Sequence, residues 1–287
     1  MLSSWLQVSV RADPAAFDVV ANFLIERGSP GVVIKKDEIH AYFIHSQDDA
    51  SIRQDIQRFL VALNGLYPAQ QRRLRWRLLK DRNWNSAWRR FFVPQKIGKT
   101  FLVTPPWARP PTFRHRQVII IEPGMAFGTG THATTRGCLE FIEKVAPWVQ
   151  GKGFRALDVG TGSGILAIAL AKSGAQRVLA VDVDPVALKV ARSNLRYNGV
   201  EKKVSLSGAT LSRIKALFPL VVANLSAETI IDQARALAKR VARRGLLILS
   251  GILHRRAEEV LKQFAGDFKV VRQKREKEWV TLLLRKI

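Results

Sequence analysis

The chain of 287 residues is long enough for one large domain or two of ordinary size, and its apolar fraction of 47% is typical of a globular rather than a disordered protein. It has no apolar stretch near the roughly 20 residues of a membrane span, no signal-peptide pattern at its start, and a single cysteine, Cys138, which excludes an internal disulfide and fits a reducing cytoplasm. Lys and Arg outnumber Asp and Glu by 47 to 23, and the net charge of +24 suggests work near RNA or another anionic assembly.

The first 80 residues alternate between strand and helix patterns. Residues 5–11 and 73–80 alternate apolar and polar side chains, as half-buried strands do, and residues 31–44 form a predicted hairpin. Asp13-Pro14 is typical of a helix start, and residues 48–63 have helical periodicity. The order β-α-β-β-α-β predicts a small ferredoxin-like α+β domain over residues 1–80.

Residues 81–115 form a predicted connector between two domains. The stretch VTPPWARPPTF is too proline-rich for regular structure and is typical of a stiff, extended segment. Trp84 and Trp88 are four residues apart and would share one helix face. A strand over residues 117–123 and a helix over residues 131–145 are expected to follow.

From residue 154 onward, strand patterns recur with helical segments between most of them. The strand-like segments are RALDVG, VLAVDVD, KVSLSG, LVVANL and LLILSG, and residues 268–286 form a predicted terminal hairpin. This alternation predicts an α/β fold in which residues 116–287 form a doubly wound, Rossmann-like parallel sheet.

Three glycines follow the first strand of this sheet. Gly160, Gly162 and Gly164 lie between the strand ending at Val159 and a helix, where a backbone without Cβ atoms can approach a ligand closely. The next strand ends with Asp182, at the position of a carboxylate that accepts hydrogen bonds from ribose hydroxyls. Together these features predict a cofactor that contains adenosine.

The spacing of the turn distinguishes between two such cofactors. Dinucleotide sites use G-x-G-x-x-G, and here Ile165 stands where that pattern has its third glycine. S-adenosylmethionine carries no phosphate, and Asp158 could serve its cationic end. In the alternative interpretation, Asp158 caps the turn and the glycines only make it tight. We favour S-adenosylmethionine over both this alternative and a dinucleotide.

Asn224 follows the fourth strand at the same edge of the sheet. It could be a helix cap or a turn residue, since asparagine favours both positions. Methylation of an amine offers another role, because a lysine amine with a pKa of about 10.4 must lose its proton before it attacks. A carboxylate would favour the ammonium form, whereas a neutral amide can orient the amine with a smaller bias. Asn224 therefore suits an amine nucleophile, with solvent removing the proton.

Several sequence blocks carry a family resemblance. The loop EPGMAFGTGTHATT (residues 122–135) resembles the signature loop of the ribosomal protein L-eleven methyltransferase (PrmA) family. Further similar blocks follow in the family's order between about residues 84 and 279: WRRFFVPQKIGKTFLVTPPW, LDVGTGSGILAIA, VDVDPVALKVA, VVANL, LSGIL and EWV. One departure lies in the glycine turn, where Thr161 replaces the family's usual cysteine.

The resemblance implies a class I S-adenosylmethionine-dependent protein methyltransferase. Its substrates would be lysine and N-terminal amino groups of a large-subunit ribosomal protein, which the N-terminal domain would recognise. The family's cofactor contacts correspond to Thr135, Gly160, Asp182 and Asn224, and Phe127 belongs to a loop over the cofactor.

Two other functions are compatible with parts of the sequence. An RNA base methyltransferase would fit the charge and Asn224, although Leu225 and Ser226 offer no aromatic platform for a flipped base. A non-catalytic ribosome-binding factor would fit the basic strand RRLRWRLLK. The five histidines are scattered without a spacing suited to zinc, so we expect no metal site.

Overall fold

The computed structural model describes residues 5–36, 38–45, 48–64, 74–79, 92–108, 115–123, 132–149 and 153–287. The chain divides into two compact units, and each is described by itself. The first unit comprises Met1–Phe92 and Pro123–Met125, and the second comprises Val93–Glu122 and Ala126–Ile287. No helix in the described ranges is long and apolar enough to cross a membrane.

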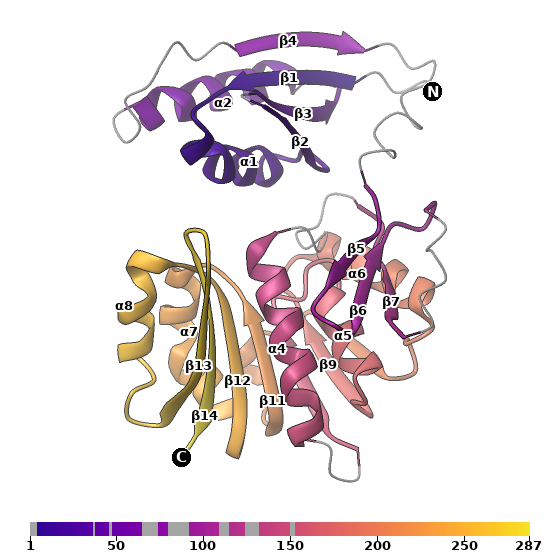
Figure 1. Cartoon of the computed structure of the whole chain (residues 1–287), viewed down its shortest axis with the longest axis vertical. Helices are drawn as coiled ribbons and strands as arrows, with labels where there is room; N and C mark the ends of the chain where they lie inside the picture. The colour runs from indigo at the N-terminus through magenta and orange to yellow at the C-terminus, as the bar shows by residue number, and fades with distance from the viewer. Residues whose placement is uncertain are drawn as a thin grey trace. The chain divides into compact units, whose positions relative to one another are not determined.

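The first unit has the predicted ferredoxin-like topology (Figure 1). Its four-stranded sheet has the order β2-β3-β1-β4, and every neighbouring pair is antiparallel. Its elements in chain order are β1 (Trp5–Arg11), η1 (Pro14–Ala16), α1 (Phe17–Glu26), β2 (Val32–Lys35), β3 (Glu38–Ile44), α2 (Asp49–Asn64) and β4 (Leu74–Leu79).

Local patterns explain these elements. The side chains of Leu6, Val8 and Val10 alternate into the core from β1, as the period of a strand requires. Asp13 accepts a hydrogen bond from the backbone N–H of Ala15 at 2.8 Å, so the expected cap begins the short helix η1.

The second unit is built around a seven-stranded sheet with the order β10-β9-β8-β11-β12-β14-β13. Five strands are parallel, while β14 is antiparallel to both of its neighbours. The strands are β8 (Arg155–Val159), β9 (Arg177–Val181), β10 (Val204–Ser207), β11 (Phe218–Asn224), β12 (Val241–Leu253), β13 (Phe268–Glu276) and β14 (Trp279–Lys286). This arrangement confirms the doubly wound sheet and the predicted terminal hairpin.

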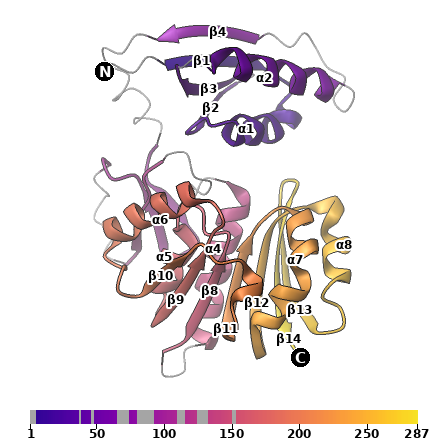
Figure 2. The ribbon, with the colours of Figure 1, turned by 180° about the vertical axis from the view of Figure 1, so that it is seen from behind.

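Helices cover both faces of this sheet. The core on one face involves α4 (Ala133–Val149), α5 (Ile165–Lys172) and α6 (Pro185–Asn198). The core on the other face involves α7 (Ala227–Arg240) and α8 (Ala257–Lys262), which Figure 2 shows side by side. The expected helix over residues 131–145 is α4, which continues past the expected end and contains Pro147 in its last turn.

A second, three-stranded sheet lies within the same unit. Strands β5 (Gln95–Ile97) and β6 (Phe101–Thr104) are antiparallel, and β7 (Gln117–Ile120) pairs with β6 in parallel. Strands β5 and β6 fall inside residues 81–115, where only a connector was expected. They were not expected because β6 is short, is followed by prolines, and pairs with β7 from further along the chain. Trp84 and Trp88 lie outside the described residues. The domain boundaries and the role of the connector stay predictions.

Candidate cofactor and substrate site

Three polar side chains meet at the carboxyl edge of the seven-stranded sheet. Asp158, Asp182 and Asn224 lie at or just beyond the ends of β8, β9 and β11, which are neighbours in the sheet. Parallel strands bring their carboxyl ends to one edge, where ligands of doubly wound folds bind. The topology therefore gathers residues that are 66 positions apart in the sequence, from Asp158 to Asn224.

The glycine turn departs from β8 at this edge. The backbone N–H groups of Gly160 and Thr161 both donate to the Val181 carbonyl, at 2.9 and 3.0 Å, which fixes the turn beside β9. Gly160 has a φ of +69°, and a Cβ there would lie 2.3 Å from Cδ2 of Leu225. The positive φ favours glycine at this position, and any other residue would also have to displace the Leu225 side chain.

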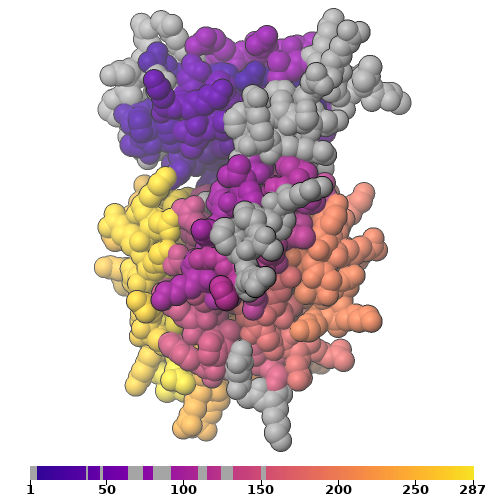
Figure 3. Space-filling model, turned by 45° about the vertical axis from the view of Figure 1, so that its right-hand side comes forward, coloured from indigo at the N-terminus to yellow at the C-terminus, as the bar shows by residue number. Residues whose placement is uncertain are grey.

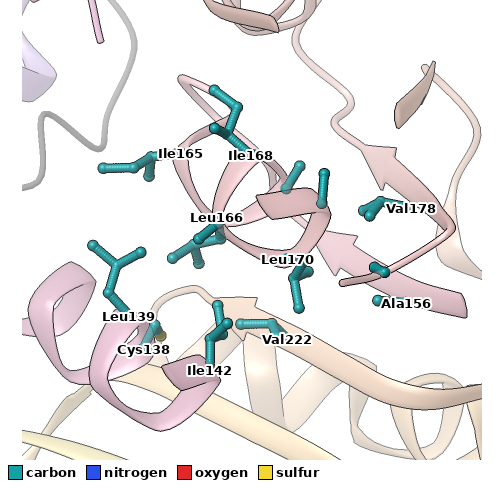
Figure 4. Close-up of a cluster of buried hydrophobic side chains, with 14 of the residues drawn as sticks. Cys138, Leu139, Ile142, Ala156, Ile165, Leu166, Ile168, Leu170, Val178 and Val222 are labelled. Carbon is teal, nitrogen blue, oxygen red and sulfur yellow. The ribbon is translucent and has the colours of Figure 1, made fainter. Parts of the chain in front are cut away.

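Gly164 has a packing role as well. Its φ is +83°, and a Cβ would lie 3.2 Å from Cβ of Ala191 in α6. The chain becomes apolar immediately after the turn because α5 packs at once into the core formed with the sheet and α4. Seven of the eight residues of α5 are buried, and Figure 4 shows Leu166 and Leu170 facing Leu139 and Ile142 of α4 across the core.

Asp158 is fully buried at the base of the turn. Its Oδ2 accepts hydrogen bonds from Thr161 Oγ1 at 2.6 Å and from the Ala167 N–H at 3.1 Å, while its Oδ1 has no partner among the described residues. Burial raises the pKa of this carboxyl to about 7, and the hydrogen bond from Thr161 opposes that rise. One carboxyl oxygen thus supports the turn, and the other is available to a cationic group.

Asp182 connects β9 to the same turn. Its Oδ2 accepts a hydrogen bond from the Gly162 N–H at 2.9 Å, and its Oδ1 accepts one from the Asp184 N–H at 3.0 Å. The side chain is partly exposed, and each carboxylate oxygen has a further lone pair. These contacts orient the carboxylate for hydroxyl donors.

Asn224 and Thr135 form a pair across the edge of the sheet. Thr135 is fully buried in the first turn of α4, and the Asn224 amide Nδ2 donates to its Oγ1 at 3.4 Å. The amide oxygen Oδ1 of Asn224 is buried and has no partner among the described residues. A buried carbonyl oxygen without a donor is costly, so this atom is suited to a ligand that brings an N–H group.

Phe127 lies outside the described residues, as do Gly128 and Gly130. The remaining predicted residues lie around the glycine turn or at the neighbouring strand ends. They are Thr135, Asp158, Gly160, Gly162, Gly164, Asp182 and Asn224. No group of three His, Cys, Asp or Glu side chains in the described ranges could hold a metal ion.

Two residues at the site were not singled out by sequence reasoning. Thr161 was noted only as a replacement for cysteine, although its hydroxyl holds Asp158. Asn194 is fully buried in α6; its Nδ2 donates to the Ser163 carbonyl at 2.8 Å, and its Oδ1 accepts from the Glu122 N–H at 3.0 Å. It was missed because its partners lie 31 and 72 residues away.

The site fits S-adenosylmethionine on structural grounds. Asp158 Oδ1 suits an ammonium or sulfonium group, and Asp182 suits ribose hydroxyls. The described side chains of the turn include no cation for a pyrophosphate, in agreement with the spacing argument.

Comparison with known proteins places this site in context. The family model described as "Ribosomal protein L11 methyltransferase (PrmA)" matches residues 4–287. A protein named "Ribosomal protein L11 methyltransferase" from Geobacter sulfurreducens is 38% identical over 305 aligned residues, which cover 99% of each chain. One of the same name from Caldicellulosiruptor saccharolyticus is 34% identical over 98% of this chain and 99% of its own. The crystal structure of a ribosomal protein L11 methylase from Lactobacillus delbrueckii subsp. bulgaricus aligns at 31% identity with a TM-score of 0.62, covering 68% of this chain and 100% of that chain.

Proposed function

Because the chain belongs to the ribosomal protein L11 methyltransferase (PrmA) family, we propose that it methylates an amine held at Asn224 by a cofactor held in the glycine turn. The family membership confirms the resemblance seen in the sequence. The protein is an S-adenosylmethionine-dependent N-methyltransferase of a large-subunit ribosomal protein.

The cofactor residues follow from the contacts at the carboxyl edge. Asp182 would bind the ribose hydroxyls, Asp158 and Thr135 the amino-acid end, and the backbone of Gly160, Gly162 and Gly164 would line the ligand. Phe127 is proposed to close over it, as in the resemblance. When bound, S-adenosylmethionine supplies an electrophilic methyl group on a sulfonium.

The observation that carries the amine assignment is the buried, unpartnered Oδ1 of Asn224. Thr135 holds the other end of this amide, so the oxygen is oriented before a substrate arrives. A neutral amide oxygen accepts a hydrogen bond from an amine without the strong preference for the ammonium form that a carboxylate would impose. The chain's contribution is then to position and desolvate the amine, and the proton leaves to solvent.

The proposal is tested by incubating the protein with isotopically labelled S-adenosylmethionine and the purified ribosomal protein. Mass spectrometry of the product is expected to find label on lysine side chains, on the N-terminal amine, or on both. Label on ribosomal RNA and none on the protein would reject the amine assignment.

Cofactor binding has its own test in Asp182→Ala. This change removes both the ribose acceptor and the bond to the Gly162 N–H, so calorimetry should detect an affinity for S-adenosylmethionine at least roughly 100-fold weaker. Asp182→Asn, which keeps one acceptor oxygen, should lose less. A near-normal affinity of the alanine variant would remove Asp182 from the site.

Three further assignments accompany this proposal. The N-terminal unit is proposed to recognise the ribosomal protein, with residues 81–115 as the connector. The basic surface is proposed to contact the ribosome or RNA. We also propose that the protein acts in the cytoplasm, where ribosomal proteins are made.

A further inference from the structure

Exposed cations gather at the amino edge of the seven-stranded sheet, opposite the edge that carries the glycine turn. At this edge each strand, or the segment that leads into it, carries at least one of them. In sheet order they are Lys202 and Lys203 before β10, Arg177 in β9, Arg155 in β8, Lys215 before β11, Arg243 and Arg244 in β12, Arg285 in β14 and Lys269 in β13. We call this set the basic row. In the space-filling view, extended side chains of the segments coloured orange and yellow project at the lower end of this unit (Figure 3).

The strand register makes the basic row continuous. Arg155 and Arg177 are directly paired in β8 and β9, and Lys269 is paired with Arg285 in β13 and β14. Arg285 Nε in turn donates to the Arg244 carbonyl at 3.5 Å, which joins β14 to β12. Neighbouring strands are spaced by about 4.8 Å, so seven strands carry the row over about 29 Å.

Little negative charge opposes the basic row. The segments that lead into these strands contain two acidic residues, Glu201 and Asp267. In the described part of the chain, no salt bridge involves a member of the row. Carboxylates lie instead at the opposite edge, where Asp158, Asp182 and Asp184 surround the turn. The basic row and the carboxylates of the glycine turn therefore lie at opposite edges of the sheet.

An exposed aromatic side chain belongs to the same edge. Trp148 is 65% exposed in the last turn of α4, and the chain enters β8 at Arg155 only seven residues later. The C-terminal end of α4, which carries Trp148, lies at the same end of the sheet as the amino end of β8 (Figure 1). Exposed aromatic rings beside a row of cations are typical of surfaces that bind single-stranded nucleic acid, where bases stack on the ring and phosphates meet the cations.

We infer that the basic row binds the phosphate backbone of a single-stranded RNA segment, with Trp148 as a stacking platform. A narrow file of cations along a sheet edge matches a linear polyanion better than the plane of a bilayer. This inference deepens the proposed RNA contact and rests on it, and it assigns that contact to a surface remote from methyl transfer. RNA and cofactor would then occupy opposite edges of one sheet.

The test compares two triple variants of the full-length protein that carry the same change in charge. The row variant removes three neighbouring members of the basic row by Arg155→Gln, Arg177→Gln and Lys203→Gln. The matched control variant removes three exposed cations of α6 and α7 by Lys189→Gln, Arg192→Gln and Arg235→Gln. Binding of a labelled, mixed-sequence single-stranded RNA is measured by fluorescence anisotropy over a range of salt concentrations.

The row variant is expected to bind this RNA roughly tenfold or more weakly than the control variant, and its salt dependence should flatten by about 0.7 for each lost phosphate contact. Trp148→Ala should weaken binding without changing the salt slope. Equal RNA binding by the two triple variants would overturn the inference, as would tight binding to anionic phosphatidylglycerol vesicles with none to RNA. Methylation of the purified ribosomal protein, measured on the same preparations, is expected to be unchanged in the row variant. Methylation by the wild-type protein without any binding of this RNA would reject the inference and leave the proposed function standing.

Discussion

Asn224 shows how a single amide can decide the protonation of a substrate. Its oxygen is buried and oriented by Thr135, yet it carries no charge that would stabilise an ammonium ion. A carboxylate in the same place would raise the pKa of a nearby amine by about 1–3 units. In the proposed function, asparagine would therefore keep more of the bound amine in its reactive, neutral form.

Asn224→Asp is expected to slow methyl transfer at neutral pH by roughly 10- to 1,000-fold, in proportion to the raised pKa of the amine. The rate should recover as the pH is increased, because the amine then loses its proton. Asn224→Ala should also be slow, but its pH profile should keep the wild-type position. Rate profiles of kcat against pH for the three proteins distinguish these outcomes, and identical profile shifts in both variants would contradict the role given to the amide.

Asp158 is the second residue whose environment has a direct functional consequence. Its pKa is raised from 3.8 to about 7 by burial, so the folded state binds a proton more tightly than the unfolded state. The contribution of this group to the free energy of unfolding is therefore greatest below pH 3.8 and is lost as the pH rises towards about 7. A bound cation beside Oδ1 would reverse this preference.

The affinity for S-adenosylmethionine is accordingly expected to fall as the pH is lowered below about 7, by up to tenfold per pH unit, because the ammonium group of the ligand favours the ionised carboxylate. Asp158→Asn should bind more weakly above that pH and lose the dependence. Thr161→Val should move the dependence to higher pH, since the hydrogen bond from Thr161 lowers the pKa of Asp158. Calorimetric titrations on both sides of this pH measure all three proteins, and a pH-independent wild-type affinity would refute the assignment.

At the scale of secondary structure, α6 connects the cofactor turn to the segment that enters the family's signature loop. Asn194 bonds to Ser163 in the turn and to Glu122 after β7, whereas Asn198 bonds to the N–H and the carbonyl of Ile120. These two asparagines, one helical turn apart, therefore hydrogen-bond to the backbone at the end of β7, as a neighbouring strand would. Only Asn194 reaches the cofactor turn.

This difference offers a matched pair of variants. Asn194→Ala and Asn198→Ala should each lower the free energy of unfolding by about 1–3 kcal/mol, because each leaves partly or fully buried backbone groups without partners. Only Asn194→Ala should also weaken S-adenosylmethionine binding, by roughly tenfold. Asn194→Asp, which can still accept from the Glu122 N–H but cannot donate to Ser163, isolates the link to the turn. Equal cofactor affinities in all variants would mean that Asn194 acts on stability alone.

At the scale of the molecule, the two units have separate cores. The first contains a cluster from β1, β3, α1 and α2, and the second contains one cluster on each face of its large sheet. All described residues proposed to bind the cofactor belong to the second unit. Substrate recognition and cofactor binding are therefore expected to be separable.

A fragment of residues 93–287 is expected to bind S-adenosylmethionine within a few-fold of the intact protein and to lose methyl transfer to the ribosomal protein. The reason is that truncation leaves the cores around the large sheet intact and removes the proposed recognition unit. Calorimetry and the labelling assay test the two halves of this prediction. Full transfer by the fragment would show that the N-terminal unit is not needed for recognition.

Local sequence patterns were sufficient for the element order, the glycine turn and the cofactor class. Alternation, periodicity and turn chemistry act over a few residues, and Gly160 to Asp182 is one short β-α-β unit. The family blocks extended this to the enzyme class. The strands β5 and β6 were missed because they are short and belong to a sheet that β7, further along the chain, completes by pairing with β6.

Other features appeared only in three dimensions. The bond from Asn194 to Glu122, the orphaned oxygens of Asp158 and Asn224, and the basic row all depend on which segments become neighbours in the sheet. Sequence alone showed a net charge of +24 without direction. The strand order placed the basic row at the edge opposite Asp158 and Asp182, because long-range pairing and strand direction decide which residues share each edge of the sheet.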